Sequence, residues 1–197
     1  CHLFREFCYS KNWTGNYEPA AQGGRTSGDS CIGQNRKGKN MKEYNRIIFV
    51  GQSGTSREPM AAGIFQDFTT RRPFEVLARG LVVLFPEPMN QKAEAVLISN
   101  GIHTEDFISV QLMEEDLTED TLVLAMEEAQ KEKILEQYEP QFPENIHVLT
   151  EFVGDELEIL DPYGGALQAY GLCYETLRKS IKKLVNMLNE GESICQK

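Results

Sequence analysis

The sequence predicts an α/β domain with a doubly wound, four-stranded parallel sheet flanked by helices. Short apolar runs, typical of strands buried on both faces, alternate with longer segments of helical periodicity from Met41 to about Asn189. Strands that alternate with helices favour a parallel sheet. The chain has 197 residues, which is enough for one such domain and an appendage.

Four segments carry the strand prediction. The first and clearest is the continuous apolar run Ile-Ile-Phe-Val at 47–50. The other three apolar runs are expected to form strands at 81–85, 121–126 and 146–149.

The helices are predicted between and after these strands. One begins near Pro59, because proline suits the first helical turn. Another covers 91–99 and ends at Asn100-Gly101, and a third covers 127–138. From Leu167 to Leu188, apolar residues repeat every three or four positions, which indicates a long helix packed against the core.

Residues 1–40 differ in composition from the rest. They have few aliphatic side chains, a Gly-Gly pair at 23–24 and no apolar period, so they cannot bury enough surface to fold alone. We expect 1–40 to be disordered or a non-native extension, with Met41 as the functional start and a regulatory tail as the alternative. The domain is expected to cover 41–190, and 191–197 to form a flexible tail.

The composition excludes several function classes. A formal net charge of −10 argues against a nucleic-acid surface, and no apolar run approaches the roughly 18 residues that span a bilayer, so we expect a cytoplasmic protein without membrane partners. The five cysteines lack a CxxC pair and the three histidines are scattered, so we expect no metal and no cofactor.

Ligands of open parallel sheets bind beyond the carboxyl ends of the strands. The turn Gly51-Gln52-Ser53-Gly54-Thr55-Ser56-Arg57 lies there, between a strand and a helix. Its backbone N–H groups, the helix N-terminus and the Arg57 guanidinium form a plausible anion site. Judged on spacing alone, a turn that only redirects the chain is an equal alternative, and the Gly-Lys-Ser/Thr ending of a nucleotide-binding loop is missing.

Residues 49–61, FVGQSGTSREPMA, resemble the strand and phosphate loop F-V-C-x-G-N-x-C-R-S-P-M-A of low-molecular-weight protein tyrosine phosphatases. The resemblance extends over the whole expected domain. It includes Arg79-Gly80-Leu81-Val82-Val83, Glu87-Pro88-Met89-Asn90, Lys131-Glu132-Lys133 and Asp161-Pro162-Tyr163-Gly164-Gly165. Thr55 and the glycine pair 164–165 look like the bacterial protein-arginine-phosphatase branch.

The resemblance implies roles for individual residues in a hydrolase that dephosphorylates proteins. The loop residues that would hold the phosphoryl group are Gln52, Ser53, Gly54, Thr55, Ser56 and Arg57. Asp161 matches the general acid, and Tyr163 matches the aromatic residue at the mouth of the substrate site. Gly51 stands where the family has its nucleophilic cysteine, so the phosphocysteine route is closed. Glu58 replaces a serine and would bring a carboxylate close to a doubly charged ligand.

These departures predict a catalytically impaired pseudophosphatase that binds a phosphorylated protein or a small phosphate-bearing ligand through 51–57. Phosphotyrosine and phosphoarginine both remain open as ligands. Two alternatives also remain: an active phosphatase in which Asp161 activates water, and a scaffold whose Glu58 repels anions. Cys173 is interpreted as a packing residue, because a reactive thiol needs an electropositive pocket. An Arg57 that faces solvent, with a carboxylate filling the loop, would contradict phosphate binding.

Overall fold

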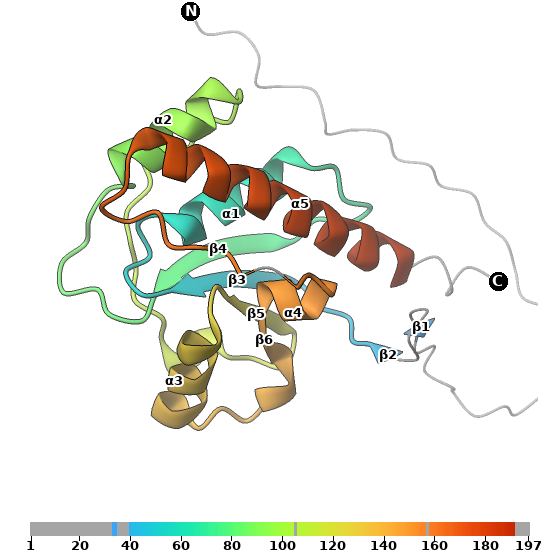
Figure 1. The fold of residues 1–197 in the computed structure, drawn as a ribbon. Coiled ribbons are helices and arrows are strands. Elements are labelled where there is room, and N and C mark those ends of the chain that lie inside the picture. Colours follow the sequence, from blue (N-terminus) through green and yellow to red (C-terminus); the bar gives the residue numbers. More distant parts are fainter. Residues whose placement is uncertain (1–32, 35–39, 105, 157, 192–197) are drawn as a thin grey trace, which may run out of the picture. The chain divides into compact units, whose positions relative to one another are not determined.

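The computed structural model describes residues 33–34, 40–104, 106–156 and 158–191 (Figure 1). Its main strands are β3 (Arg46–Gly51), β4 (Glu75–Gly80), β5 (Thr121–Ala125) and β6 (Ile146–Val148). Its α-helices are α1 (Arg57–Asp67), α2 (Gln91–Ser99), α3 (Glu128–Tyr138), α4 (Leu149–Val153) and α5 (Leu167–Gly191). Two 3-10 turns, Glu114–Asp116 and Pro143–Asn145, precede β5 and β6.

The four main strands form one parallel sheet in the order β4-β3-β5-β6. The first strand of this sheet therefore lies between the second and the third. Because all the strands are parallel, the loops after β3, β5 and β6 lie at the same carboxyl edge, and the change of direction in the strand order between β3 and β5 is a topological switch point. The predicted four-stranded parallel sheet is confirmed.

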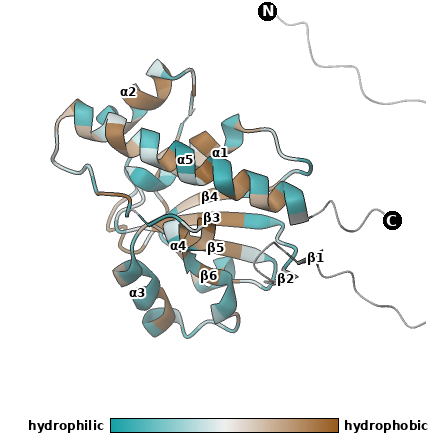
Figure 2. Cartoon of the chain, turned by 45° about the vertical axis from the view of Figure 1, so that its right-hand side comes forward, coloured by the Kyte–Doolittle hydropathy of each residue, from teal (hydrophilic) through white to brown (hydrophobic). Residues whose placement is uncertain are grey.

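Helices cover both faces of the sheet (Figure 1). One core contains Ile47 and Phe49 of β3 together with the inner faces of α1, α2, α4 and α5. The other contains Ile48 and Val50 with Ile134 of α3. Successive strand residues thus face opposite cores, which explains why β3 is apolar throughout. In Figure 2 the strands of the sheet are largely hydrophobic, and the helices around it carry both hydrophobic and hydrophilic residues, as α5 shows most clearly.

The prediction of a strand at 81–85 is wrong. The second strand is β4, six residues earlier in the sequence, and it pairs with β3 in the register Arg46↔Glu75 to Gly51↔Gly80. The apolar run after it leaves the sheet, and the side chains of Leu84 and Phe85 are 82% and 76% exposed. These two side chains are therefore exposed apolar surface and do not belong to the core.

Most of the segment 1–40 lies outside the described residues, as does 192–197, so the predictions of disorder there stay predictions. Within the described part, β1 (Gly33–Gln34) pairs antiparallel with β2 (Asn40–Met41). None of the helices that the structure describes combines the length and the apolar character that crossing a membrane requires. The cytoplasmic location expected from the sequence stays a prediction.

Candidate functional site

The turn from Gly51 to Ser56 connects the end of β3 to α1 and curls at the carboxyl edge of the sheet. Its carbonyl oxygens accept bonds from outside the loop: Leu81 N–H donates to Gly51 O at 2.9 Å, and Val82 N–H donates to Gln52 O at 3.0 Å. Asn90 N–H donates to Thr55 O at 2.9 Å. With these carbonyls turned outward and satisfied, the inside of the loop is left to N–H groups and side chains.

Two glycines allow the loop to pack against the end of β4. Gly54 has φ +72°, and a Cβ on it would lie 2.8 Å from Gly80 N. A Cβ on Gly80 would in turn lie 2.6 Å from the carbonyl carbon of Ser53. The backbones are too close for side chains at these positions, so both glycines help to define the shape of the loop.

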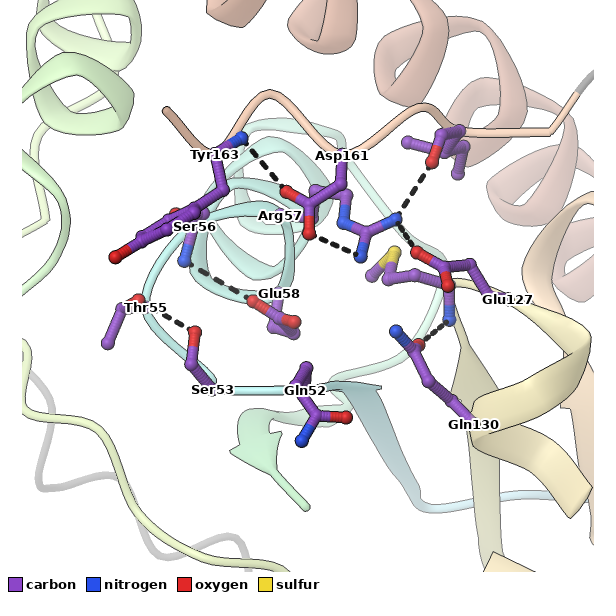
Figure 3. A network of polar contacts seen from close by, with 12 residues as sticks. Gln52, Ser53, Thr55, Ser56, Arg57, Glu58, Glu127, Gln130, Asp161 and Tyr163 are labelled. Atoms are coloured by element: carbon purple, nitrogen blue, oxygen red, sulfur yellow. Dashed lines mark hydrogen bonds and ion pairs between the residues drawn. The ribbon is translucent and has the colours of Figure 1, made fainter. Parts of the chain in front are cut away.

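Glu58 is the residue inside the loop (Figure 3). Its side chain folds back from the first turn of α1, is 3% exposed, and accepts a bond from Ser56 N–H at 3.3 Å. A Cβ on Gly51 would lie only 1.5 Å from Glu58 Oε1 and 2.5 Å from Cδ. The carboxyl group therefore occupies the space that any side chain at position 51 would need.

Burial raises the pKa of the Glu58 carboxyl above its usual range, and the Asp161 carboxylate raises it further. Bonds from backbone N–H groups and the charge of Arg57 act in the opposite direction without cancelling the effect of burial. Near neutral pH, Glu58 is therefore more easily protonated than an exposed glutamate.

Arg57 does not face solvent. Its side chain is 2% exposed and lies between two carboxylates: NH1 is 2.6 Å from Glu127 Oε1, and NH2 is 3.2 Å from Asp161 Oδ2 (Figure 3). NH1 also donates to Ile159 O at 2.9 Å. Phosphate binding would be contradicted by an Arg57 that faces solvent together with a carboxylate in the loop. Only the second of these is observed, because a carboxylate fills the base of the loop while the arginine stays at the site.

Asp161 lies opposite the loop, and its side chain is 46% exposed. It is oriented by two contacts, the one with Arg57 and a bond from Tyr163 N–H to Asp161 Oδ1 at 3.0 Å. The Tyr163 side chain stands at the rim of the site and is 75% exposed. The predicted acid and the predicted mouth residue are therefore close to the loop, although about a hundred residues separate them from it in sequence.

An open cavity of ≈ 250 Å³ remains above the loop. It is lined by Gln52, Ser53, Thr55, Ser56, Arg57, Glu58, Glu87, Asp161 and Tyr163. All predicted site residues except Gly51 and Gly54 line it, and those two glycines belong to the same turn.

Three hydroxyl groups of the loop add polar character to this cavity. Ser53 Oγ and Thr55 Oγ1 share a hydrogen bond of 2.9 Å. Ser56 is 5% exposed, and within the described part of the chain its Oγ has no partner at good hydrogen-bond geometry, although an interaction with Ser56 opposes the rise that burial causes in the pKa of Tyr170. A buried hydroxyl without a partner is costly and is a candidate contact for a ligand.

Two lining or supporting carboxylates were missed from the sequence. The sequence predicts Glu127, which follows β5 closely, only as the start of a helix, and Glu87 appears only within the segment Glu87-Pro88-Met89-Asn90 that resembles the family. Glu127 could have been found from its position, because the carboxyl end of β5 shares an edge with the loop. The resemblance includes Glu87 but assigns it no role at the site.

Cys173 on α5 is 5% exposed, and burial raises its pKa to about 12. The nearby carboxylates of Asp161 and Glu58 act in the same direction, against the charge of Arg57. Its thiol therefore stays protonated near neutral pH and is a poor nucleophile. No group of three or more His, Cys, Asp or Glu side chains in the described part of the chain is arranged to hold a metal ion.

A parallel sheet with this strand order, a loop closed by Ser-Arg at a helix N-terminus, and an Asp-Pro segment facing it together agree with the resemblance noted in the sequence. Residues 46–193 match the family described as low molecular weight phosphotyrosine protein phosphatase. The chain belongs to this family.

Individual relatives lie in both branches suggested by the sequence. A protein-arginine-phosphatase from Geobacillus stearothermophilus is 32% identical over 145 residues, covering 73% of this chain and 95% of the relative. The crystal structure of a low molecular weight protein tyrosine phosphatase from T. tengcongensis has a TM-score of 0.68 at 35% identity, covering 73% of this chain and 99% of the other. A mutant of the YwlE arginine phosphatase with a phosphorylated active site serine has a TM-score of 0.69 at 27% identity, covering 76% of this chain and 99% of the other.

Proposed function

We propose that this chain binds a phosphoryl group, carried by a phosphorylated protein, in the loop 51–57, and that it lacks the thiol chemistry of its family. The observation that carries the proposal is the pairing of a kept cavity with a lost nucleophile. The loop, Arg57 and Asp161 are assembled around ≈ 250 Å³ of open space. Gly51 offers no nucleophile, and Cys173 is buried with a raised pKa.

The chemistry of the lining supports an oxyanion as the ligand. Inward backbone N–H groups at the start of α1, the buried hydroxyl of Ser56 and the Arg57 fork are the donors that phosphate uses in proteins. Glu58 opposes a dianion while it is charged, but its raised pKa makes the neutral form accessible. The relative with a phosphorylated active site serine supports the idea that this fold can hold a phosphoryl group on an oxygen atom of its active site. Phosphotyrosine and phosphoarginine are both candidates, since relatives of both kinds match.

The test is a titration followed by NMR of the backbone amides. Inorganic phosphate, phenyl phosphate and phosphoarginine are added to wild-type protein at millimolar concentration, and the amide resonances of 52–57 are expected to shift. Arg57→Lys keeps a charge between Glu127 and Asp161 but loses the two-pronged donor, so binding should weaken at least about tenfold. Arg46→Lys is the matched control, because Arg46 pairs with Glu75 on the surface. If no ligand shifts the loop amides at any pH between 5 and 8, the proposal fails.

A second candidate function, a scaffold without a phosphate ligand, is supported by the protein groups that already fill the site. Arg57 already has three acceptors, and Glu58 fills the base of the loop, so the fold could serve as a scaffold without a phosphate ligand. Glu58→Ser separates the two. A scaffold blocked by Glu58 binds phosphate only after the substitution, whereas a phosphate-binding protein binds it before and binds it more tightly afterwards.

A further inference from the structure

The departures from the family pattern at positions 51 and 58 are sterically linked. Oε1 of Glu58 lies 1.5 Å from the point where a Cβ of residue 51 would be. In the family pattern, that Cβ would carry the attacking sulfur atom into the loop. The structure therefore has a carboxyl oxygen close to the place of the missing nucleophile, delivered from a different position of the chain.

The surroundings of this carboxyl group fit a nucleophile as well as a packing residue. Glu58 lines the base of the cavity, so it faces the space where a phosphoryl group would lie. Ser56 N–H donates to the other oxygen, Oε2, at 3.3 Å and fixes the orientation of the group. Arg57 lies beside it to hold phosphoryl oxygens, and Asp161 faces the same cavity from the opposite side (Figure 3).

We propose that the Glu58 carboxylate is a relocated nucleophile, which attacks a bound phosphate ester or phosphoramidate and forms an acyl phosphate. This inference rests on the proposed binding of a phosphoryl group at 51–57. Carboxylate nucleophiles that form acyl phosphates are established enzyme chemistry. The reaction is slow relative to a thiolate enzyme because the carboxyl group is buried and must first ionise.

The first step transfers the phosphoryl group. A carboxylate oxygen of Glu58 forms a bond to phosphorus, and the bond from phosphorus to the leaving oxygen or nitrogen breaks. The leaving atom keeps the electron pair and takes a proton from the carboxylic acid of Asp161. Arg57 and the loop N–H groups hold the three remaining phosphoryl oxygens.

The second step returns the enzyme to its starting state. A water molecule attacks phosphorus and gives its proton to the Asp161 carboxylate. The bond between phosphorus and the Glu58 oxygen breaks, and Glu58 leaves as a carboxylate. The net reaction consumes one water and releases one phosphate and one alcohol or amine, so no other reactant is needed.

The burial of Glu58 also affects its attack on phosphorus in the first step. Its raised pKa means that less of the group is ionised at a given pH than in an exposed glutamate, while the same rise makes the ionised oxygen a stronger nucleophile. The ionisable groups that interact with Glu58 are the Arg57 guanidinium, the Asp161 carboxyl group and the Cys173 thiol of α5. The first step uses Glu58 in its ionised form and Asp161 in its acid form.

The experiment traps the intermediate on the wild-type chain. The protein is incubated with p-nitrophenyl phosphate, stopped with acid and treated with sodium borohydride, which reduces an acyl phosphate to an alcohol. Peptide mass spectrometry should then show the peptide containing Glu58 with one oxygen replaced by two hydrogens. In Glu58→Gln, the trapped product should vanish and turnover should fall at least about 10³-fold. Glu175→Gln, an exposed carboxylate on α5, is the control.

The outcomes separate this inference from the proposed function. Loop amides that shift with phosphate, together with no reduced Glu58 peptide, would overturn the nucleophile and leave phosphate binding intact. Turnover that is unchanged in Glu58→Gln would overturn it too. If phosphate fails to shift the loop amides, both proposals fall. Trapping is measured on wild-type protein, so a Glu58→Gln variant that does not fold leaves the test decisive.

Discussion

Adding a single methyl group at position 51 should test whether Glu58 occupies the loop. In Gly51→Ala, the new Cβ would lie 1.5 Å from Glu58 Oε1 and 2.5 Å from its Cδ, so the carboxyl group has to leave. Forced repacking of a filled interior costs about 1–3 kcal/mol. Losing the bond from Ser56 N–H adds about 1 kcal/mol or more, because the acceptor is ionisable. We expect the free energy of unfolding to fall by about 3 kcal/mol.

The decisive measurement repeats this substitution in the Glu58→Ser background. Without the carboxyl group the methyl group has space, so Gly51→Ala should cost less than about 1 kcal/mol there, which gives a coupling of about 2 kcal/mol between the two positions. Urea denaturation of the four proteins, followed by circular dichroism, gives these free energies. Gly171→Ala is the control, because nothing lies within 4 Å of the added Cβ. If the two substitutions add within about 0.5 kcal/mol, Glu58 does not occupy this space.

Three further predictions concern other parts of the domain. Gly80→Ala places a Cβ 2.6 Å from the carbonyl carbon of Ser53, so the free energy of unfolding should fall by about 1–3 kcal/mol. Urea denaturation measures this change, and an unchanged midpoint would contradict the close approach. Partial burial raises the pKa of Asp155, but hydrogen bonds from Lys183 and Ser180 have the larger combined effect, so its pKa is lowered. Its stabilising effect is therefore present above the unfolded pKa of about 3.9 and lost as pH falls through the folded value, so urea denaturation should separate Asp155→Asn from wild type at pH 7 more than at pH 3. Cys173, with its pKa raised to about 12 by burial, should react with iodoacetamide at pH 8 much more slowly in native protein than in urea, as followed by mass spectrometry; equal rates would contradict its burial.

The sequence was sufficient for the elements that have strong patterns. The run 47–50 is buried on both faces, and the stripe from Tyr170 to Leu188 is buried along one side of α5, so hydrophobicity and position in the fold agree there. Leu167, at the start of the predicted stripe, is 50% exposed. The strand β4 was missed because it is an edge strand with a mostly half-exposed pattern, and its sequence, EVLARG, has no continuous apolar run. The more hydrophobic run that follows β4 misled the interpretation. Periodicity records how apolar a segment is, and does not record whether that apolar surface is covered.

The site was predictable where topology alone brings residues together. Arg57 and Asp161 both follow strands of one parallel sheet, so their meeting at the carboxyl edge could be expected from strand order. Glu127 has the same position after β5, yet its pairing with Arg57 was not anticipated, because a carboxylate at the start of a helix already has a local explanation. The position of the Glu58 side chain inside the loop was out of reach of sequence reasoning, since it depends on how tightly seven residues curl.

The curl of the loop makes two departures from the family pattern into one structural unit. With Glu58 present, no residue larger than glycine fits at position 51, because the first added carbon would overlap the carboxyl oxygen. With Gly51 present, a short side chain at position 58 would leave the base of the loop empty and the Ser56 N–H without its acceptor. Each residue is therefore unfavourable without the other, and each makes the other acceptable. Restoring a thiol at position 51 alone would displace a buried carboxyl group into a site that already holds Asp161 and Glu127, so chemistry of the family type requires both positions to change together.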